Sequence, residues 1–219
     1  MIRRFLAAAA FAAIALAHPS ASAQSVGAFL EINPPIAADA KGKIKVVEFF
    51  WYECGHCYSF EPHLDAWLKK LPKDVEFRRV PAIWNQQMAI SARVFYTLEA
   101  IGELDRLHKP LFDAIHKDRL RITNERQLLD WLERQKVDVN KFSAAAGSFG
   151  VESRLKRGLE LWQASKADGV PAMMVNGRFL VLAGAGNTEQ RMIGTTDALV
   201  AALRKELAAT APAPKAAKK

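Results

Sequence analysis

The sequence predicts an α/β protein in which one β-sheet is interrupted by an all-helical insertion. Apolar runs typical of β-strands occur at residues 45–51 and 75–80 and again at residues 169–181. Between these regions, residues 86–167 carry apolar side chains at helical spacing. Two strand-rich regions that enclose one helical block are typical of a single sheet with an insertion.

The first predicted strand is an apolar run from Lys45 to Trp51, and a helix is expected soon after it. The only two cysteines of the chain stand at this junction, in the motif Cys54-Gly55-His56-Cys57. Unpaired backbone N–H groups and the positive end of the helix dipole favour an anion at such a place. A thiolate is such an anion, and its stabilisation makes a cysteine reactive. The helix itself is indicated by an apolar stripe of Phe60, Leu64, Trp67, Leu68 and Leu71.

A second strand is predicted at residues 75–80, and Pro81 breaks its pattern. The chain then reads as successive helices over residues 86–167. Thr123 or Asn124 is a suitable N-cap for one of these helices. Their apolar stripes indicate a packed core rather than a cofactor site.

A second region with the pattern of β-strands follows the helical block, at residues 169–181. Asn176-Gly177 lies between two apolar runs there, and this pair is a strong signal for a β-hairpin turn. A closing helix is expected from about Thr188 or Thr195 to Leu207. The second strand-rich region therefore consists of a hairpin followed by a helix.

The start of the chain predicts a secretory signal peptide over residues 1–23. Two arginines precede an apolar stretch at residues 5–17, and Ala21-Ser22-Ala23 stands before Gln24. A membrane anchor is the alternative, but a spanning helix needs about 20 apolar residues, and this stretch is shorter. We expect cleavage before Gln24 and export from the cytoplasm.

The charge of the chain indicates no polyanionic partner. The formal net charge is +8, and two of the arginines lie in the predicted signal peptide. Three lysines lie in an Ala/Pro/Lys tail at residues 210–219, which is expected to be disordered. No basic stripe with interleaved aromatic residues is present, so nucleic-acid binding is not expected.

Three chemical roles are open to the cysteine pair: a redox-active dithiol, a static disulfide, or half of a zinc site. An exported chain with only two cysteines is not a disulfide-stapled scaffold. A structural zinc site needs about four ligands, and the spacing of His56 and His63 suits no common site. We therefore favour redox chemistry and expect no metal.

Two motifs of the chain resemble DsbA-type thiol:disulfide oxidoreductases of the thioredoxin superfamily. The first is Glu48-Phe49-Phe50 followed by the cysteine motif and then by Phe60-Glu61, and the second is the segment from Gly169 to Gly177. The resemblance implies a thioredoxin-like fold with an inserted all-helical subdomain. The expected divisions are a signal peptide (1–23), a first thioredoxin-like part (24–85), the helical insertion (86–167), a second thioredoxin-like part (168–209) and the tail (210–219).

The position and chemistry of the dithiol predict different roles for its residues. Cys54 is expected to be the sulfur attacked by a substrate thiolate, which forms a mixed disulfide while Cys57 leaves. His56 is expected to stabilise the Cys54 thiolate; the alternative is an exposed polar residue without a role. Most well-known family members carry proline at the position of Gly55, whereas Gly-His is also typical of protein disulfide isomerases.

The resemblance implies further site residues. Glu48 would be a buried acid beneath the dithiol that helps proton transfer at Cys57, although an outward-facing edge residue is the alternative. Val170 and Pro171 would form a cis-proline loop that faces the cysteines. In that loop the backbone of Val170 would pair with an extended substrate. Glu61 either tunes the charge near the site or lies on a solvated helix face.

These features together predict a periplasmic oxidase that donates its Cys54–Cys57 disulfide to newly exported, unfolded proteins. The cysteines carry the electrons, so no bound cofactor is expected, and the chain is expected to be a monomer. The resemblance implies reoxidation by a DsbB-like, quinone-linked inner-membrane oxidase. The alternatives are a disulfide isomerase or reductase, and a thioredoxin-fold chaperone without a redox role.

Overall fold

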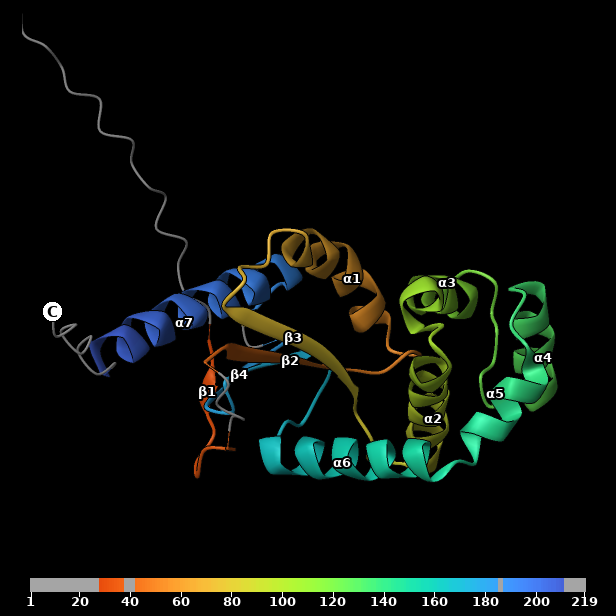
Figure 1. Ribbon diagram of the computed structural model, residues 1–219. Coiled ribbons are helices and arrows are strands. Elements are labelled where there is room, and N and C mark those ends of the chain that lie inside the picture. Colours follow the sequence, from red (N-terminus) through yellow and green to blue (C-terminus); the bar gives the residue numbers. More distant parts are fainter. Residues whose placement is uncertain (1–27, 38–41, 185–186, 211–219) are drawn as a thin grey trace, which may run out of the picture.

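The computed structural model describes residues 28–37, 42–184 and 187–210 of the 219-residue chain (Figure 1). The expected signal peptide, its cleavage point before Gln24 and residues 211–219 of the expected tail lie outside this part. Within the described ranges, no helix is both long enough and apolar enough to span a membrane.

The core of the fold is a five-stranded mixed sheet with strand order β1-β5-β4-β2-β3. β2 and β3 run parallel, and the other neighbouring pairs are antiparallel. Both predicted strands of the first region are confirmed, whereas the short strand β1 was not predicted. The strands are β1 (Leu30–Glu31), β2 (Ile44–Phe50), β3 (Val75–Pro81), β4 (Ala172–Val175) and β5 (Phe179–Leu182).

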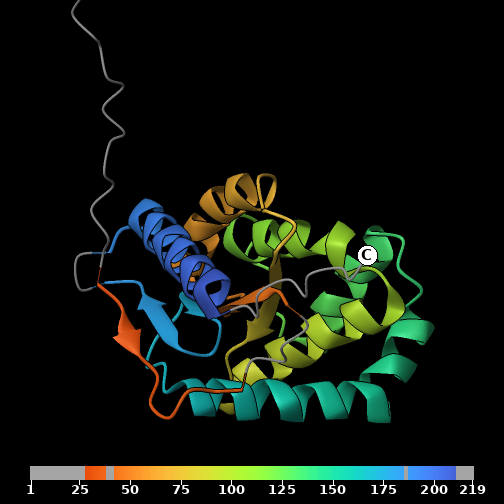
Figure 2. The ribbon, with the colours of Figure 1, turned by 60° about the vertical axis from the view of Figure 1, so that its left-hand side comes forward.

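Helices cover both faces of the sheet, which confirms the predicted α/β class. Figures 1 and 2 place α1 and α7 on one side of the sheet and α6 on the other. Five helices fill the chain between β3 and β4, where the insertion is expected. The helices are α1 (Gly55–Leu68), α2 (Gln86–Ile101), α3 (Leu104–His116), α4 (Glu125–Arg134), α5 (Val139–Ala146), α6 (Phe149–Ser165) and α7 (Glu189–Thr210).

The central strand β2 divides its side chains between the two faces because successive residues of a strand point to opposite sides. Val46 packs in the core beneath α1 and α7. Val47 and Phe49 pack in the core against α6. Glu48 has the parity of Val46 and therefore points toward the side of α1, where the cysteines lie.

Four of the five inserted helices, all except α3, begin at a side-chain cap. Asn85, Asn124, Asp138 and Ser148 each accept a hydrogen bond from a backbone N–H in the first turn of the helix that follows. Of the two caps predicted for α4, Asn124 is therefore the correct one. The apolar stripes of these helices meet in one buried cluster, which also contains Phe50, Tyr52 and Cys57.

The predicted hairpin turn lies between β4 and β5. Asn176 and Gly177 both have positive φ, at 53° and 67°, as a two-residue hairpin turn requires. A Cβ atom on Gly177 would lie 2.1 Å from the carbonyl oxygen of Ile36. Glycine is therefore needed at this position, since the N-terminal segment crosses the turn there and Ile36 N–H donates to Gly177 O at 2.9 Å.

Candidate active site

Cys54 is the N-cap residue of α1, with extended backbone angles of φ −83° and ψ 116°. Its Sγ atom accepts a hydrogen bond from the Cys57 N–H at 3.4 Å. The chain turns here because the Cys54 N–H donates to Trp51 O at 3.1 Å, directly after β2 ends. Both cysteines are free thiols in this structure. The dithiol therefore lies where the sequence predicts it, at the junction of strand and helix.

The two sulfurs have opposite acid–base properties. A hydrogen bond from the Cys57 side chain, backbone N–H groups of Cys57 and His56, and the charge of His56 lower the pKa of Cys54 to about 6, against the effect of partial burial. Burial raises the pKa of the Cys57 thiol well above its usual value, and its hydrogen bond to Cys54 adds to this effect. Cys57 is fully buried. Near neutral pH the accessible sulfur is thus mainly a thiolate and the buried one a thiol.

His56 lies in the first turn of α1, between the two cysteines, and its side chain is exposed. Its charge is one of the contributions that lower the pKa of Cys54. The structure thus places His56 where the predicted stabilisation of the thiolate requires it.

The loop before β4 faces the dithiol across the end of the sheet. The Val170–Pro171 peptide bond is cis, which confirms the isomer that the family resemblance implies. Cys54 Sγ lies 3.6 Å from Val170 O, where the sulfur can donate a hydrogen bond only when it is protonated. Pro171 is buried at the start of β4. Within the described residues the Val170 N–H donates no hydrogen bond, so this group is open to an incoming chain.

A buried group of charges lies beneath the dithiol. Glu48 is fully buried, and because β2 runs between β3 and β4 the interpretation of an edge residue is wrong. The parallel register places Arg79 directly opposite Glu48, with Arg79 Nε 3.1 Å from Glu48 Oε2. Nη2 of the same guanidinium donates to Glu61 at 3.1 Å. Glu61 is only 4% exposed, so a solvated helix face is also wrong for it.

Two residues that sequence reasoning missed extend this group toward the cysteines. His108 of α3 lies with Nε2 3.5 Å from Glu61 Oε1, and its Nδ1 is hydrogen-bonded to Tyr52 OH at 2.8 Å. Tyr52 stands two residues before Cys54. Burial lowers the pKa of His108, so the imidazole is neutral at neutral pH. The sequence signal is a lone histidine beside Leu107 on an apolar helix face, which is typical of core packing.

The carboxyl group of Glu48 is the least compensated charge of this cluster. Its oxygens accept no hydrogen bond from the described residues, and Arg79 forms an ion pair with it without hydrogen-bond geometry. Burial therefore outweighs the charge of Arg79 and raises the pKa of Glu48 to about 8. Burial also opposes ionisation of Glu61, but its contact with His108 and the hydrogen bonds and charge of Arg79 hold its pKa below the usual range. Glu48 can thus hold a proton near neutral pH, while Glu61 stays ionised.

The helical insertion contacts the start of α1 through a second set of side chains. The ring of His116 stacks on Tyr58 at 4.5 Å, and His116 Nε2 donates to Tyr52 O at 2.8 Å. Tyr58 OH donates to Asp113 at 2.7 Å. These contacts hold α3 against the segments on both sides of Cys54.

No group of three or more His, Cys, Asp or Glu side chains in the described ranges is arranged to hold a metal ion.

A mixed sheet with a Cys-x-x-Cys motif at a helix N-terminus, opposite a cis-proline loop, defines the class of thioredoxin-fold thiol:disulfide oxidoreductases. A family model for the DSBA-like thioredoxin domain matches residues 73–194. This chain belongs to the DsbA family. It is a thiol:disulfide oxidoreductase whose own cysteine pair carries the electrons.

Relatives match over most of the chain. The thiol:disulfide interchange protein DsbA of Bordetella parapertussis is 39% identical over 205 residues, which cover 92% of this chain and 97% of the relative. DsbA of Azotobacter vinelandii is 38% identical over 172 residues, or 78% of this chain and 80% of the relative. The crystal structure of Pseudomonas aeruginosa DsbA superimposes with a TM-score of 0.78 at 33% identity, covering 82% of this chain and 94% of that one.

Proposed function

We propose that this oxidoreductase works as a disulfide donor for newly exported proteins. The observation that carries the proposal is the asymmetry of the two sulfurs. The pKa of Cys54 is lowered to about 6, whereas burial raises that of Cys57. Stabilisation of the Cys54 thiolate favours the reduced form of the pair, and a pair whose reduced form is stabilised is an oxidant.

The proposed reaction begins with the Cys54–Cys57 disulfide. A substrate thiolate attacks Cys54 Sγ, forms a mixed disulfide and displaces Cys57 as a thiolate, which takes up a proton. A second substrate thiolate then attacks the substrate sulfur of the mixed disulfide and displaces Cys54 as a thiolate. The substrate loses two electrons, which remain on the two cysteines. Glu48, which can hold a proton on the side of the sheet facing α1, supports proton transfer at Cys57.

The substrate is proposed to bind as an extended chain beside the cis-proline loop. The Val170 N–H, which donates to no described residue, and the Val170 carbonyl, 3.6 Å from Cys54 Sγ, can form main-chain hydrogen bonds with substrates of any sequence. The Pro171 ring limits access of metal ions to the sulfurs. Main-chain recognition of this kind suits unfolded proteins of many sequences.

The proposed compartment is the periplasm, reached by means of a signal peptide at residues 1–23. A DsbB-like, quinone-linked inner-membrane oxidase is the proposed partner that restores the disulfide. In the reduced protein the half-exposed Cys54 thiolate would attack a disulfide of this partner and form a mixed disulfide. Cys57 would then attack Cys54 Sγ and displace the partner's thiolate, which restores the Cys54–Cys57 disulfide, so no further cofactor of this chain is needed. The chain is proposed to act as a monomer.

Oxidation of reduced, unfolded ribonuclease A by stoichiometric oxidised protein tests the proposal. We expect rapid formation of substrate disulfides and complete loss of this activity in Cys54→Ser. In Cys57→Ser, incubated instead with scrambled ribonuclease, the Cys54 thiolate should attack a substrate disulfide and remain trapped as a mixed disulfide. Reshuffling of scrambled ribonuclease at a rate above net oxidation would favour the isomerase alternative. Aggregation suppression that survives Cys54→Ser/Cys57→Ser, with no oxidation by the wild type, would favour the chaperone.

A further inference from the structure

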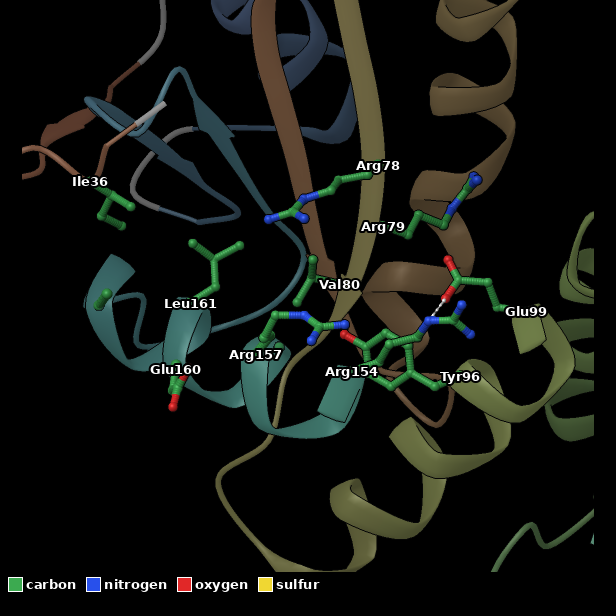
Figure 3. A pocket seen from close by; sticks show the side chains of 12 residues that line it. Ile36, Arg78, Arg79, Val80, Tyr96, Glu99, Arg154, Arg157, Glu160 and Leu161 are labelled. Carbon is green, nitrogen blue, oxygen red and sulfur yellow. Dashed lines mark ion pairs between the residues drawn. The ribbon is translucent and has the colours of Figure 1, made fainter. Parts of the chain in front are cut away.

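A cavity of about 560 Å³ lies between β3, α2 and α6, on the side of the sheet opposite α1 (Figure 3). Neither cysteine lines it. Its volume is within the range of about 300–1,000 Å³ that small-molecule sites occupy. The strand pattern explains its chemistry: Arg78 has the parity of Val80 and points toward α6, whereas Arg79 points toward the buried charges below α1.

The cavity has an excess of positive charge. Arg78 enters from β3 and Arg157 from α6, so their guanidinium groups face the cavity from two walls (Figure 3). The Arg78 side chain makes no hydrogen bond or ion pair with any residue that the structure describes. Arg157 bonds only to the hydroxyl of Ser153 on its own helix, not to a carboxylate. The other two arginines of the lining are paired: Arg154 is 3.5 Å from Glu99, and Arg79 pairs with Glu48 and Glu61. Glu160, the second carboxylate of the lining, is 3.9 Å from Lys156.

The hydroxyl group of Tyr96 is a built-in donor of this cavity. The Tyr96 side chain is only 6% exposed, yet within the described chain its hydroxyl makes no hydrogen bond. The oxygen lies against Gly158 of α6, where a Cβ atom would come within 2.3 Å of it. Burial raises the pKa of Tyr96, so the phenol keeps its proton and can donate it in a hydrogen bond. Because no described group accepts from it, this hydroxyl can donate a hydrogen bond to a ligand that lies in the cavity beside the two guanidinium groups.

Apolar side chains complete the walls. Ile36, Val80, Leu161 and Ala164 line the cavity beside the arginines. Such a lining suits an apolar body that carries an anionic head, because a guanidinium fork binds a carboxylate or phosphate through two parallel hydrogen bonds.

We propose that this cavity is a binding site for a small organic anion. Arg78 and Arg157 hold its phosphate or carboxylate head, Tyr96 OH donates a further hydrogen bond, and the apolar body packs against Ile36 and Leu161. The site is separate from the dithiol and involves no covalent step.

Isothermal titration with phenyl phosphate and with benzoate tests the site, with neutral benzyl alcohol as the matched ligand control. We expect saturable binding of one or both anions and none of the alcohol. Arg78→Ala/Arg157→Ala should weaken binding about tenfold or more, since a hydrogen bond to a charged group contributes about 1.5–3 kcal/mol. Tyr96→Phe should weaken it about two- to tenfold. Arg126→Ala, which removes an exposed arginine of α4 outside the cavity, should leave binding unchanged.

Both arginines of the double variant are exposed, so folding and insulin reduction should match the wild type. Tyr96→Phe tests the site independently of the arginines, since it removes one hydroxyl group only. The proposal is overturned if neither anion binds saturably at millimolar concentration. It is equally overturned if benzyl alcohol binds as well as the anions, or if the double variant binds with wild-type affinity.

Discussion

The Sγ atom of Cys54 lies 3.6 Å from the carbonyl oxygen of Val170, although the two residues are 116 positions apart. The helical insertion separates them in sequence, and the antiparallel pairing of β4 with β2 brings them together in space. The reactive sulfur therefore faces a backbone edge that can hold a substrate in place. The reactive sulfur and the backbone groups proposed to bind the substrate therefore lie at the same end of the sheet.

The acidity of Cys54 gives the first prediction. In the reduced protein, thiolate absorbance at 240 nm should titrate with a pKa of about 6 and disappear in Cys54→Ser. Cys57→Ala removes the largest stabilising hydrogen bond and should raise this pKa by about one unit or more. Cys57→Ser retains a donor and should stay closer to the wild type. Equal pKa values in the Ala and Ser variants would contradict a role for the Cys57 hydrogen bond.

The charge of His56 gives the second prediction. His56→Ser should raise the pKa of Cys54 and shift the equilibrium with glutathione toward the disulfide form, because the thiolate loses a neighbouring positive charge. We expect a shift of about tenfold in the equilibrium constant, which corresponds to about 30 mV. His63→Ser, an exposed histidine farther along α1, is the matched control. Identical equilibria for both variants would leave His56 without a tuning role.

The buried carboxyl group of Glu48 predicts an unusual dependence of stability on pH. Its pKa is raised to about 8, so between about pH 4.5 and 8 the folded protein keeps a proton that the unfolded chain releases. The free energy of unfolding should therefore lose about 1.4 kcal/mol per pH unit from this group as the pH rises. Glu48→Gln removes this loss. The free energy of unfolding of the variant should therefore increase relative to that of the wild type as the pH rises from about 4.5 to 8.

Urea unfolding of the oxidised proteins across this pH range measures the difference without interference from the thiols. Glu76→Gln, which removes an exposed carboxyl group from β3, controls for the change in net charge. Parallel stability curves for Glu48→Gln and the wild type would show that Glu48 ionises as an ordinary glutamate.

The hydrogen bond between Tyr52 and His108 gives the fourth prediction. At 2.8 Å in a buried site it should contribute a coupling energy of about 0.5–1.5 kcal/mol. A double-mutant cycle with Tyr52→Phe and His108→Phe, read out by urea unfolding, measures this coupling. Additive effects of the two substitutions would mean that the two side chains only pack against each other.

Local patterns were enough to predict much of the fold. Asn176-Gly177 predicted the hairpin because few residue pairs adopt two consecutive positive φ angles. The apolar run of β2 and the stripe of α1 located the dithiol at their junction. The strand β1 could not be predicted, because Leu30–Glu31 is only two exposed residues long and exists through pairing with β5.

The reactive residues of the site were predicted more fully than their supporting partners. Cys54 and Cys57 are recognisable from their spacing together with their place between a strand and a helix, and the burial of Glu48 was one of two open interpretations. Its partner Arg79 depends on the register of a parallel strand pair, which no short-range pattern encodes. His108 resembles a core residue in sequence, and only the packing of α3 against α1 shows what it contacts.

The redox potential of the Cys54–Cys57 pair tests the central claim most directly. Equilibration with glutathione buffers, followed by thiol trapping and tryptophan fluorescence, measures it. We predict a potential well above the poise of about −180 to −210 mV in an oxidising compartment such as the endoplasmic reticulum, as expected of a disulfide donor. A value near that of thioredoxin, about −270 mV, would contradict the account and indicate a reductase or an isomerase that is kept reduced.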